Sequence, residues 1–194
     1  MLILSHRNYK YGFGVETDIR DYKGELVISH DIADENCRRV EDFLESHCGI
    51  NPELFIAFNI KADGLQGKLK ELLLKYKLLN YFVFDMSVPD ALGYLKLGIN
   101  AFTRQSEHET IPSFYKGAQG VWVDGFTSEW VDESTIRGHL EQGKQVCLVS
   151  PELHGRSYGL YWRKLLDMKV INDPGLIICT DYPEEAREVF SAKN

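Results

Sequence analysis

The sequence lacks the features that would place the protein in a membrane or mark it for export. No apolar run approaches the ~20 residues that a helix needs to span a bilayer. The opening residues, Met1–Leu4, form no basic leader and are followed by no cleavage site. We therefore expect neither a transmembrane segment nor a signal peptide.

Cysteine is scarce, and no two cysteines are spaced as a Cys-x-x-Cys pair. Two of the four lie in strand-like apolar runs; the four are Cys37, Cys48, Cys147 and Cys179. This pattern favours buried, reduced thiols over disulfides and predicts a cytoplasmic protein.

Positive charge is also in short supply, since the net charge is −7. Domains that bind the phosphate backbone are usually basic, so we expect no nucleic-acid partner. The negative net charge likewise disfavours docking on anionic lipid, although it is compatible with a local basic pocket. The nucleotide-binding loops G-x-G-x-x-G and G-x-x-x-x-G-K-[ST] are both absent.

The 194 residues suffice for one sizeable core, so we predict a single domain over 1–194. Apolar runs recur along it with helical stretches between most of them. The predicted strands are 2–5, 15–19, 26–29, 54–60, 81–85, 99–103, 120–123, 145–149 and 176–180. Several are apolar throughout, as is typical of a parallel sheet buried on both faces.

Helix signals separate the strands. Asp34, Ser87 and Asp181 are placed to cap helices, the first of which would end at Gly49. One stripe at helical spacing predicts core packing; it comprises Leu65, Leu69, Leu72, Leu73, Tyr76 and Leu79.

Alternating strands and helices predict a parallel α/β fold. The link Asp21–Gly24 indicates a hairpin, which makes 26–29 an antiparallel flap on 15–19. Eight strands then remain, the number of a (β/α)8 TIM barrel; a doubly wound open sheet is the alternative. The link Arg7–Gly14 is too short for a crossover helix, so either the barrel lacks its first helix or the strand boundaries are wrong.

In such a barrel, the residues at the carboxyl ends of the strands share one mouth. Glu16 and Asp18 would point to the same side of their strand, as would Asn59 and Lys61. Other polar residues follow strands or the flap; they are His6, His30, Asp85, Arg104, Asp124 and Glu152.

Two carboxylates on one face repel each other, and a divalent cation with its preference for oxygen ligands resolves that conflict. Glu16 and Asp18 are therefore candidate metal ligands, with an ordinary solvated strand edge as the alternative. Two histidines flank the pair in sequence, His6 and His30, and imidazoles can carry protons. The combination predicts metal-assisted chemistry on a phosphate ester.

Several cationic and acidic residues are candidate substrate ligands. Arg7 has the geometry for bidentate phosphate binding, and Lys61 could neutralise a phosphoryl oxygen. Arg104 and Glu152 are candidates for ligand contact, with salt bridges at the barrel rim as the alternative.

Three motifs resemble those of the glycerophosphodiester phosphodiesterase family, within the phospholipase-C-like phosphodiesterase superfamily. They are His6-Arg7, Glu16-x-Asp18 and Gly24-x-Leu26-Val27-x-Ser29-His30-Asp31. The resemblance continues weakly at Asn59-Ile60-Lys61-Ala62 and returns at Ile178–Pro183.

The resemblance implies a TIM barrel that cleaves a small-molecule phosphodiester to an alcohol and a phosphomonoester. It implies that His6 and His30 act as general acid and base, and that Arg7 and Lys61 hold the phosphate. Glu16 and Asp18 would bind Mg²⁺ or Ca²⁺. In relatives, a neighbouring hydroxyl of the substrate can attack first and give a cyclic phosphate.

The chain departs from the family pattern in three ways. Asn59 stands where the family has a third metal-binding glutamate, which predicts weaker metal binding unless Glu152 compensates. Asn8 replaces a glycine, and a helix-bearing segment before the carboxylates is absent. The family's small insertion after His-Asp is also expected to be missing, because a helix is predicted to begin at Asp34. We therefore expect a more open mouth and a substrate that need not be a glycerophosphodiester.

Two other functions stay open at this stage. A degenerate barrel could bind a phosphorylated ligand without turning it over, as Asn59 and the short first unit favour. Alternatively, the two histidines could form a cyclic phosphate and release it, which would make the enzyme a lyase. The sequence does not indicate an oligomeric state.

Overall fold

A computed structural model describes all residues except 1, 6–11, 51–52, 54 and 192–194. It contains one nine-stranded sheet. The strands are β1 (Leu2–Ser5), β2 (Gly14–Tyr22), β3 (Glu25–Ile28), β4 (Ile56–Ile60), β5 (Tyr81–Phe84), β6 (Phe102–Gln105), β7 (Gly120–Val123), β8 (Gln145–Val149) and β9 (Leu176–Cys179). The helices are α1 (Val40–Ile50), α2 (Gln66–Lys75), α3 (Val88–Lys96), α4 (Glu133–Glu141), α5 (Gly159–Asp167) and α6 (Pro183–Ser191), with 3₁₀ turns η2 (Pro151–His154) and η3 (Lys169–Asn172).

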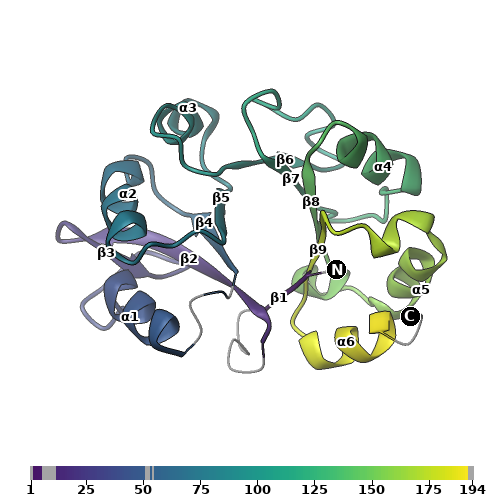
Figure 1. Cartoon of the computed structure of the whole chain (residues 1–194), viewed down its shortest axis with the longest axis horizontal. Coiled ribbons are helices and arrows are strands. Elements are labelled where there is room, and N and C mark those ends of the chain that lie inside the picture. Colours follow the sequence, from purple (N-terminus) through teal and green to yellow (C-terminus); the bar gives the residue numbers. More distant parts are fainter. Residues whose placement is uncertain (1, 6–11, 51–52, 54, 192–194) are drawn as a thin grey trace.

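The sheet follows the order β5-β4-β2-β1-β9-β8-β7-β6, and every pairing along this path is parallel. It curves so that β5, β4 and β2 face β6 to β9, with the helices on the outside (Figure 1). The predicted parallel α/β architecture is confirmed.

The predicted closed barrel is not confirmed, because the ladder breaks between the two end strands. β5 and the residues before β6 share one isolated bridge, Val83 to Ala101, in which the Val83 N–H donates to the Asn100 carbonyl at 2.8 Å. Two residues earlier on β5, the Tyr81 carbonyl accepts a hydrogen bond from the side-chain amide of Asn100 at 3.5 Å. β5 and β6 form no regular ladder in the described sheet, so their pairing does not close the ring of strands.

The hairpin between β2 and β3 forms as predicted. β3 pairs antiparallel with β2, and the two-residue turn is Lys23-Gly24. Both turn residues have positive φ, at 47° and 85°, which glycine adopts without steric cost at the second position. The segment between β1 and β2 lies largely outside the described residues, so the missing first helix stays a prediction.

The predicted helix start at Asp34 is wrong, because α1 begins at Val40. The Asp34 carboxylate instead accepts the Asn36 N–H at 2.9 Å, a local turn that competes with a helix. Residues 29–39 therefore form a loop between β3 and α1. An early helix is thus no reason for an insertion to be missing after Asp31. By contrast, Ser87 caps α3 as expected, accepting the Asp90 N–H at 3.4 Å.

The leucine stripe packs on the sheet only as far as its helix extends. Leu69 and Leu73 of α2 are buried, whereas Leu79 is 81% exposed. α2 ends at Lys75, so the helical spacing no longer applies to Leu79. Its assignment to the core was wrong.

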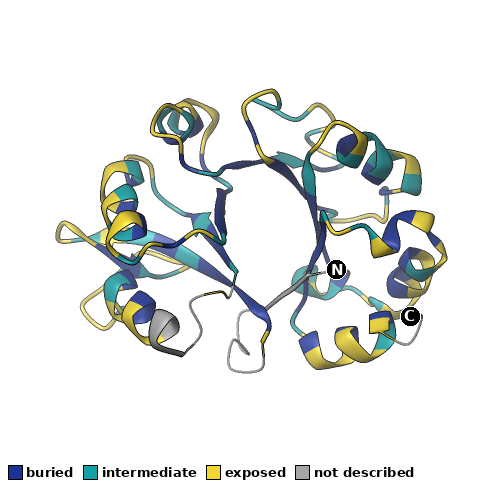
Figure 2. Cartoon of the chain, in the orientation of Figure 1, coloured by how far each residue is buried: buried dark blue, intermediate teal, exposed yellow. Residues whose placement is uncertain are grey.

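Two layers of apolar side chains flank the strands, which are the most buried part of the molecule (Figure 2). The inner layer fills the space that the curved sheet surrounds. Phe82 stacks on Phe102 with ring centroids 3.8 Å apart, and Phe84 stacks on Trp122 at 3.9 Å. A Cβ on Gly120 would lie 2.4 Å from the Phe102 ring, so this strand position requires glycine.

The helices of the described chain include none that is long and apolar enough to span a bilayer.

Candidate functional site

A cavity of about 470 Å³ lies at the carboxyl ends of the strands. Its floor is apolar and its walls are polar. It is lined by Glu16, Asp18, His30, Asn59, Lys61, Phe84, Asp85, Arg104, Trp122, Asp124, Phe126, Val149, Leu153, His154 and Asp181. Six residues predicted from the sequence to form the site therefore meet in one place; they are Glu16, Asp18, His30, Asn59, Lys61 and Arg104.

Three oxygen-bearing side chains come from adjacent strands on one side of this cavity. Glu16 and Asp18 are two residues apart on β2, and Asp18 pairs in register with Asn59 of β4. Glu16 is 3% exposed. The Asn59 Oδ1 atom is buried and accepts no hydrogen bond from any described residue. A buried amide oxygen beside two carboxylates fits a hard divalent cation.

The donor set is nevertheless small. Within the described part of the chain, no group of three or more histidine, cysteine, aspartate and glutamate side chains is arranged to hold a metal. A three-ligand metal site here therefore requires the Asn59 amide oxygen as its third ligand.

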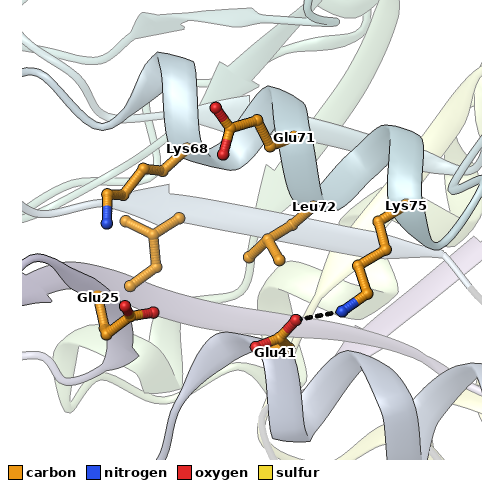
Figure 3. A pocket seen from close by; sticks show the side chains of 7 residues that line it. Glu25, Glu41, Lys68, Glu71, Leu72 and Lys75 are labelled. Atoms are coloured by element: carbon orange, nitrogen blue, oxygen red, sulfur yellow. Dashed lines mark hydrogen bonds and ion pairs between the residues drawn. The ribbon is translucent and has the colours of Figure 1, made fainter.

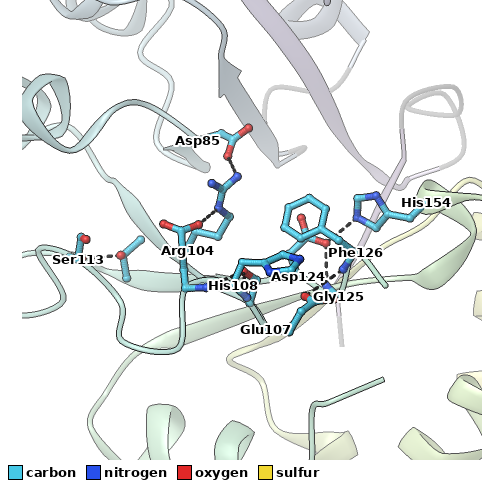
Figure 4. Close-up of polar contacts among 12 residues, drawn as sticks. Asp85, Arg104, Glu107, His108, Ser113, Asp124, Gly125, Phe126 and His154 are labelled. Carbon is cyan, nitrogen blue, oxygen red and sulfur yellow. Dashed lines mark hydrogen bonds and ion pairs between the residues drawn. The ribbon is translucent and has the colours of Figure 1, made fainter. Parts of the chain in front are cut away.

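A chain of alternating charges crosses the cavity beside these oxygens. The Lys61 ammonium lies 3.5 Å from Asp18 and 3.4 Å from Asp85. Arg104 is 2.6 Å from the other Asp85 oxygen and also pairs with Glu109 (Figure 4). Asp85 thus sits between two cations, and its φ of 70° is rare for a residue other than glycine. Such conformations concentrate at functional sites.

Arg104 keeps its charge in this setting. Burial by itself would lower the pKa of Arg104, but the carboxylates of Asp85 and Glu109 outweigh it and raise the pKa. Arg104 therefore carries positive charge that the carboxylates of Asp85 and Glu109 partly compensate.

His30 lies at the edge of the cavity, in the loop that follows β3. Its Nδ1–H donates to Asp31 at 3.0 Å. The side chains of His30 and Asp31 are 72% and 93% exposed. Water therefore competes with this hydrogen bond, and the ring is only weakly oriented.

A second histidine in the cavity was missed by the sequence analysis. His154, at the end of η2, donates from Nε2 to Asp124 Oδ1 at 2.7 Å (Figure 4). The Asp124 side chain is only 8% exposed and that of His154 is 25% exposed. A lone histidine in a 3₁₀ turn has no periodic sequence signal. The one available clue in the sequence was Asp124, which follows a predicted strand and therefore belongs to the residues expected at the mouth of the barrel.

Phe126 lies between the His154–Asp124 pair and Arg104. Its ring centroid lies 4.9 Å from that of His154, and the Arg104 guanidinium lies 5.7 Å from the same ring. Phe126 belongs to a loop that Glu107 fastens by accepting the N–H groups of residues 126, 127 and 128 at 3.1, 2.6 and 3.2 Å. Burial alone would raise the pKa of Glu107, but these hydrogen bonds hold the pKa at about 2.

Glu152 does not line the cavity. Its carboxylate accepts hydrogen bonds from the hydroxyls of Ser150 and Thr180 and from the Asp181 N–H. These contacts tie the turn that carries His154 to the end of β9. The prediction that Glu152 contacts a ligand is therefore not supported, because its carboxylate is engaged with the scaffold next to the cavity. His6 and Arg7 lie outside the described residues, so their roles stay predictions.

His139, in contrast, is part of the scaffold. Its Nε2–H donates to Gln105 at 2.7 Å, and its Nδ1 accepts from the Tyr115 hydroxyl at 2.8 Å. Burial lowers the pKa of His139 and so favours the neutral ring that this pattern requires.

Three of the cysteines are free thiols: Cys37, Cys147 and Cys179. Burial, reinforced by negative charge such as that of Glu16, raises the pKa of both Cys147 and Cys179 well above the usual value. These two thiols stay protonated and belong to the inner apolar layer.

A smaller cavity of about 260 Å³ lies outside the strands, between β3, α1 and α2 (Figure 3). Glu41 and Lys75 form an ion pair across it at 2.5 Å, and three further charged residues line it: Glu25, Lys68 and Glu71. Its charges largely compensate one another on an exposed surface, so it offers no comparable chemistry.

Solved structures share this architecture over nearly the whole chain. A glycerophosphodiester phosphodiesterase from Agrobacterium tumefaciens superposes with a TM-score of 0.70 at 12% identity, covering 98% of this chain and 99% of the other. The chain has the fold of the glycerophosphodiester phosphodiesterases. A candidate member from Galdieria sulphuraria gives a TM-score of 0.76 at 17% identity, covering 98% and 97% of the two chains. The enzyme from Thermotoga maritima gives 0.64 at 14% identity, covering 97% and 98%.

No family model matches the sequence, and no curated protein matches it significantly. The resemblance inferred from the motifs is thus confirmed through the fold.

Proposed function

We propose that the protein is a metal-dependent phosphodiester hydrolase acting on a small-molecule diester. The observation that carries the proposal is the convergence of Glu16, Asp18 and Asn59 with Lys61 and Arg104 in one cavity, in the fold of the glycerophosphodiester phosphodiesterases. Oxygen ligands for a cation beside fixed positive side chains suit a phosphodiester, because the negative charge of its phosphoryl oxygens and the charge that develops on the leaving oxygen must both be stabilised.

Glu16, Asp18 and Asn59 would hold Mg²⁺ or Ca²⁺. When bound, such a cation would polarise a phosphoryl oxygen and stabilise charge as it develops. The buried, unpartnered Asn59 oxygen supports this assignment, because the described residues otherwise leave its desolvation uncompensated.

Lys61 and Arg104 would orient the phosphate. Both contact Asp85, which keeps their charged groups pointed at the cavity before substrate arrives. Arg7, from the segment outside the described residues, would add a further contact by the family resemblance.

His30 would transfer protons, with His6 as its partner by the same resemblance. Its exposure at the edge of the cavity suits a group that exchanges protons with water. A hydrolase and a lyase of this kind would use the same groups up to the first bond cleavage. The lyase alternative differs only in the second step, in which the cyclic phosphate is released instead of being hydrolysed.

Hydrolysis of bis(p-nitrophenyl) phosphate with Mg²⁺ or Ca²⁺ tests the proposal. We expect turnover that chelator abolishes and that His30→Ala lowers by ~10²-fold or more. His108→Ala is the matched control, because His108 is exposed and does not line the cavity. Absence of turnover with every diester and cation tried would contradict the proposal.

Product analysis by phosphorus NMR separates the hydrolase from the lyase, since only the lyase accumulates cyclic phosphate. The binding-only alternative predicts that a phosphorylated ligand raises the melting temperature with no product formed.

A further inference from the structure

The His154–Asp124 pair is the most strongly oriented proton-carrying group in the described walls of the cavity. The imidazole is partly exposed to the cavity, while its carboxylate partner is almost fully buried. Because Nε2 is committed to Asp124 at 2.7 Å, Nδ1 is the ring nitrogen left for a ligand.

The surroundings hold this pair in place from both sides. Asp124 Oδ1 also accepts the Gly125 N–H at 2.8 Å, and the Asp124 carbonyl accepts from the Trp130 indole at 2.7 Å. The Arg156 guanidinium donates to the Gly125 carbonyl. On the other side, the turn bearing His154 is tied to β9 through Glu152. Such a set of contacts preorganises a side chain rather than leaving it to solvent.

The pair also lies across the sheet from the proposed metal ligands. Asp124 follows β7, which is separated from β2 by β1, β9 and β8 in the sheet order. A phosphate bound by the Lys61 ammonium, next to a cation held by Glu16 and Asp18, would have the wall formed at the ends of β7 and β8 on its far side. Phe126 and Trp122 line that wall and offer apolar surface for the departing group.

We propose that His154 is a catalytic residue that protonates the leaving alcohol, with Asp124 as its positioning residue. This inference rests on the proposed diesterase function. The attacking oxygen, from water or from a neighbouring hydroxyl of the substrate, forms a bond to phosphorus and gives its proton to His30. The phosphorus–oxygen bond to the alcohol breaks, its electron pair stays on the ester oxygen, and the Nδ1 proton of the doubly protonated His154 ring moves to that oxygen. The alcohol leaves neutral and His154 becomes neutral. The buried Asp124 carboxylate compensates the positive charge of the ring before the transfer. His30 is then left to act on the nucleophile.

A structural role for His154 is the competing explanation, because its ring also packs on Phe126. The two explanations differ in how activity depends on the leaving group. A general acid matters for a strongly basic alkoxide and matters little for p-nitrophenolate, which leaves without a proton. A residue that only shapes the cavity affects both substrates alike.

The experiment compares glycerophosphocholine, which has an alkyl leaving group, with bis(p-nitrophenyl) phosphate. For His154→Gln we expect kcat to fall by ~10²-fold or more on the alkyl diester and by less than ~5-fold on the aryl diester. Asp124→Asn should produce the same selectivity with a smaller loss. His108→Gln serves as the control and should leave the ratio of the two rates unchanged.

Equal losses on both substrates, or no loss on either, would overturn the inference while the diesterase function stands. If His154→Gln fails to fold, judged by circular dichroism and the melting temperature, His154→Asn and Asp124→Asn carry the same comparison. If the wild-type protein hydrolyses neither diester with either cation, the proposed function fails, and this inference with it.

Discussion

The Lys61 ammonium lies 3.5 Å from the Asp18 carboxylate, so the proposed phosphate ligand is also an ion-pair partner of a proposed metal ligand. Both side chains are mostly buried, at 18% and 17% exposed. Solvent therefore screens this contact less than it screens a surface salt bridge.

Removing this lysine should change metal binding and catalysis in opposite directions. Lys61→Gln eliminates a positive charge next to the cation site, so we expect Mg²⁺ or Ca²⁺ to bind about fivefold more tightly, corresponding to ~1 kcal/mol. Diesterase activity should fall, because the phosphate loses a contact. Calorimetric titration measures the first effect; Lys116→Gln, an exposed position, is the control. Weaker metal binding in Lys61→Gln would show that the ion pair helps to build the site.

Asn59→Glu should strengthen metal binding. The substitution adds a negative charge at a position that pairs in register with Asp18, and carboxylate count governs affinity in oxygen-ligand sites. We expect at least about a tenfold lower Kd, equivalent to ~1.4 kcal/mol. Asn59→Gln keeps an amide on a longer side chain and should not tighten binding. If both variants bind metal as the wild type does, position 59 is not a ligand.

Gly120→Ala should destabilise the fold. The new methyl group would meet the Phe102 ring at 2.4 Å and disturb its stacking on Phe82. Overpacking of this kind costs ~1–3 kcal/mol in the free energy of unfolding. Urea denaturation measures it.

Gly138→Ala provides the matched control for that variant. Gly138 lies within α4, and a Cβ there would meet no atom within 4 Å. Alanine in a helix is favoured over glycine by ~0.5–1 kcal/mol, so this variant should be more stable than the wild type. Equal free energies of unfolding for the two variants would show that the inner aromatic layer accommodates the added methyl group at little cost.

Acid should weaken the hydrogen bonds by which the Glu107 carboxylate holds the loop that carries Phe126. The folded pKa of Glu107 is about 2, below its usual value of 4.5. A lowered folded-state pKa means that the contribution to stability is present above the unfolded value and is lost as pH falls from about 4.5 to about 2. Glu107→Gln should therefore lower the melting temperature at pH 7 and flatten its decline between pH 5 and pH 3. A mutant whose melting temperature declines with acid as steeply as that of the wild type would contradict this assignment.

The candidate site was predictable where strand periodicity applied. Glu16 and Asp18 are two residues apart on one strand, so any β-structure there places both on one face. Lys61 and Arg104 were identified because carboxyl ends of parallel strands converge on one edge. The position of Asn59 followed from the same two rules, whereas His30 follows the antiparallel strand β3, to which the rule on parallel strand ends does not apply.

Local signals failed where tertiary contacts decided the outcome. Asp34 has the composition of a helix cap, but its carboxylate closes a turn, and α1 begins later. Leu79 matched the spacing of a helical stripe, but α2 ends before Leu79 and leaves it exposed.

The sequence by itself determined the parallel α/β architecture and the two-carboxylate strand, because alternation and strand-end position act over a few residues. Only the tertiary structure decided that Glu152 faces the scaffold and that His154 meets Asp124 across 30 residues of chain. The physical reason is that a 3₁₀ turn has no repeating pattern, so the direction of each side chain depends on contacts with distant strands. The break between β5 and β6 has the same origin, since closure depends on how residues far apart in sequence align.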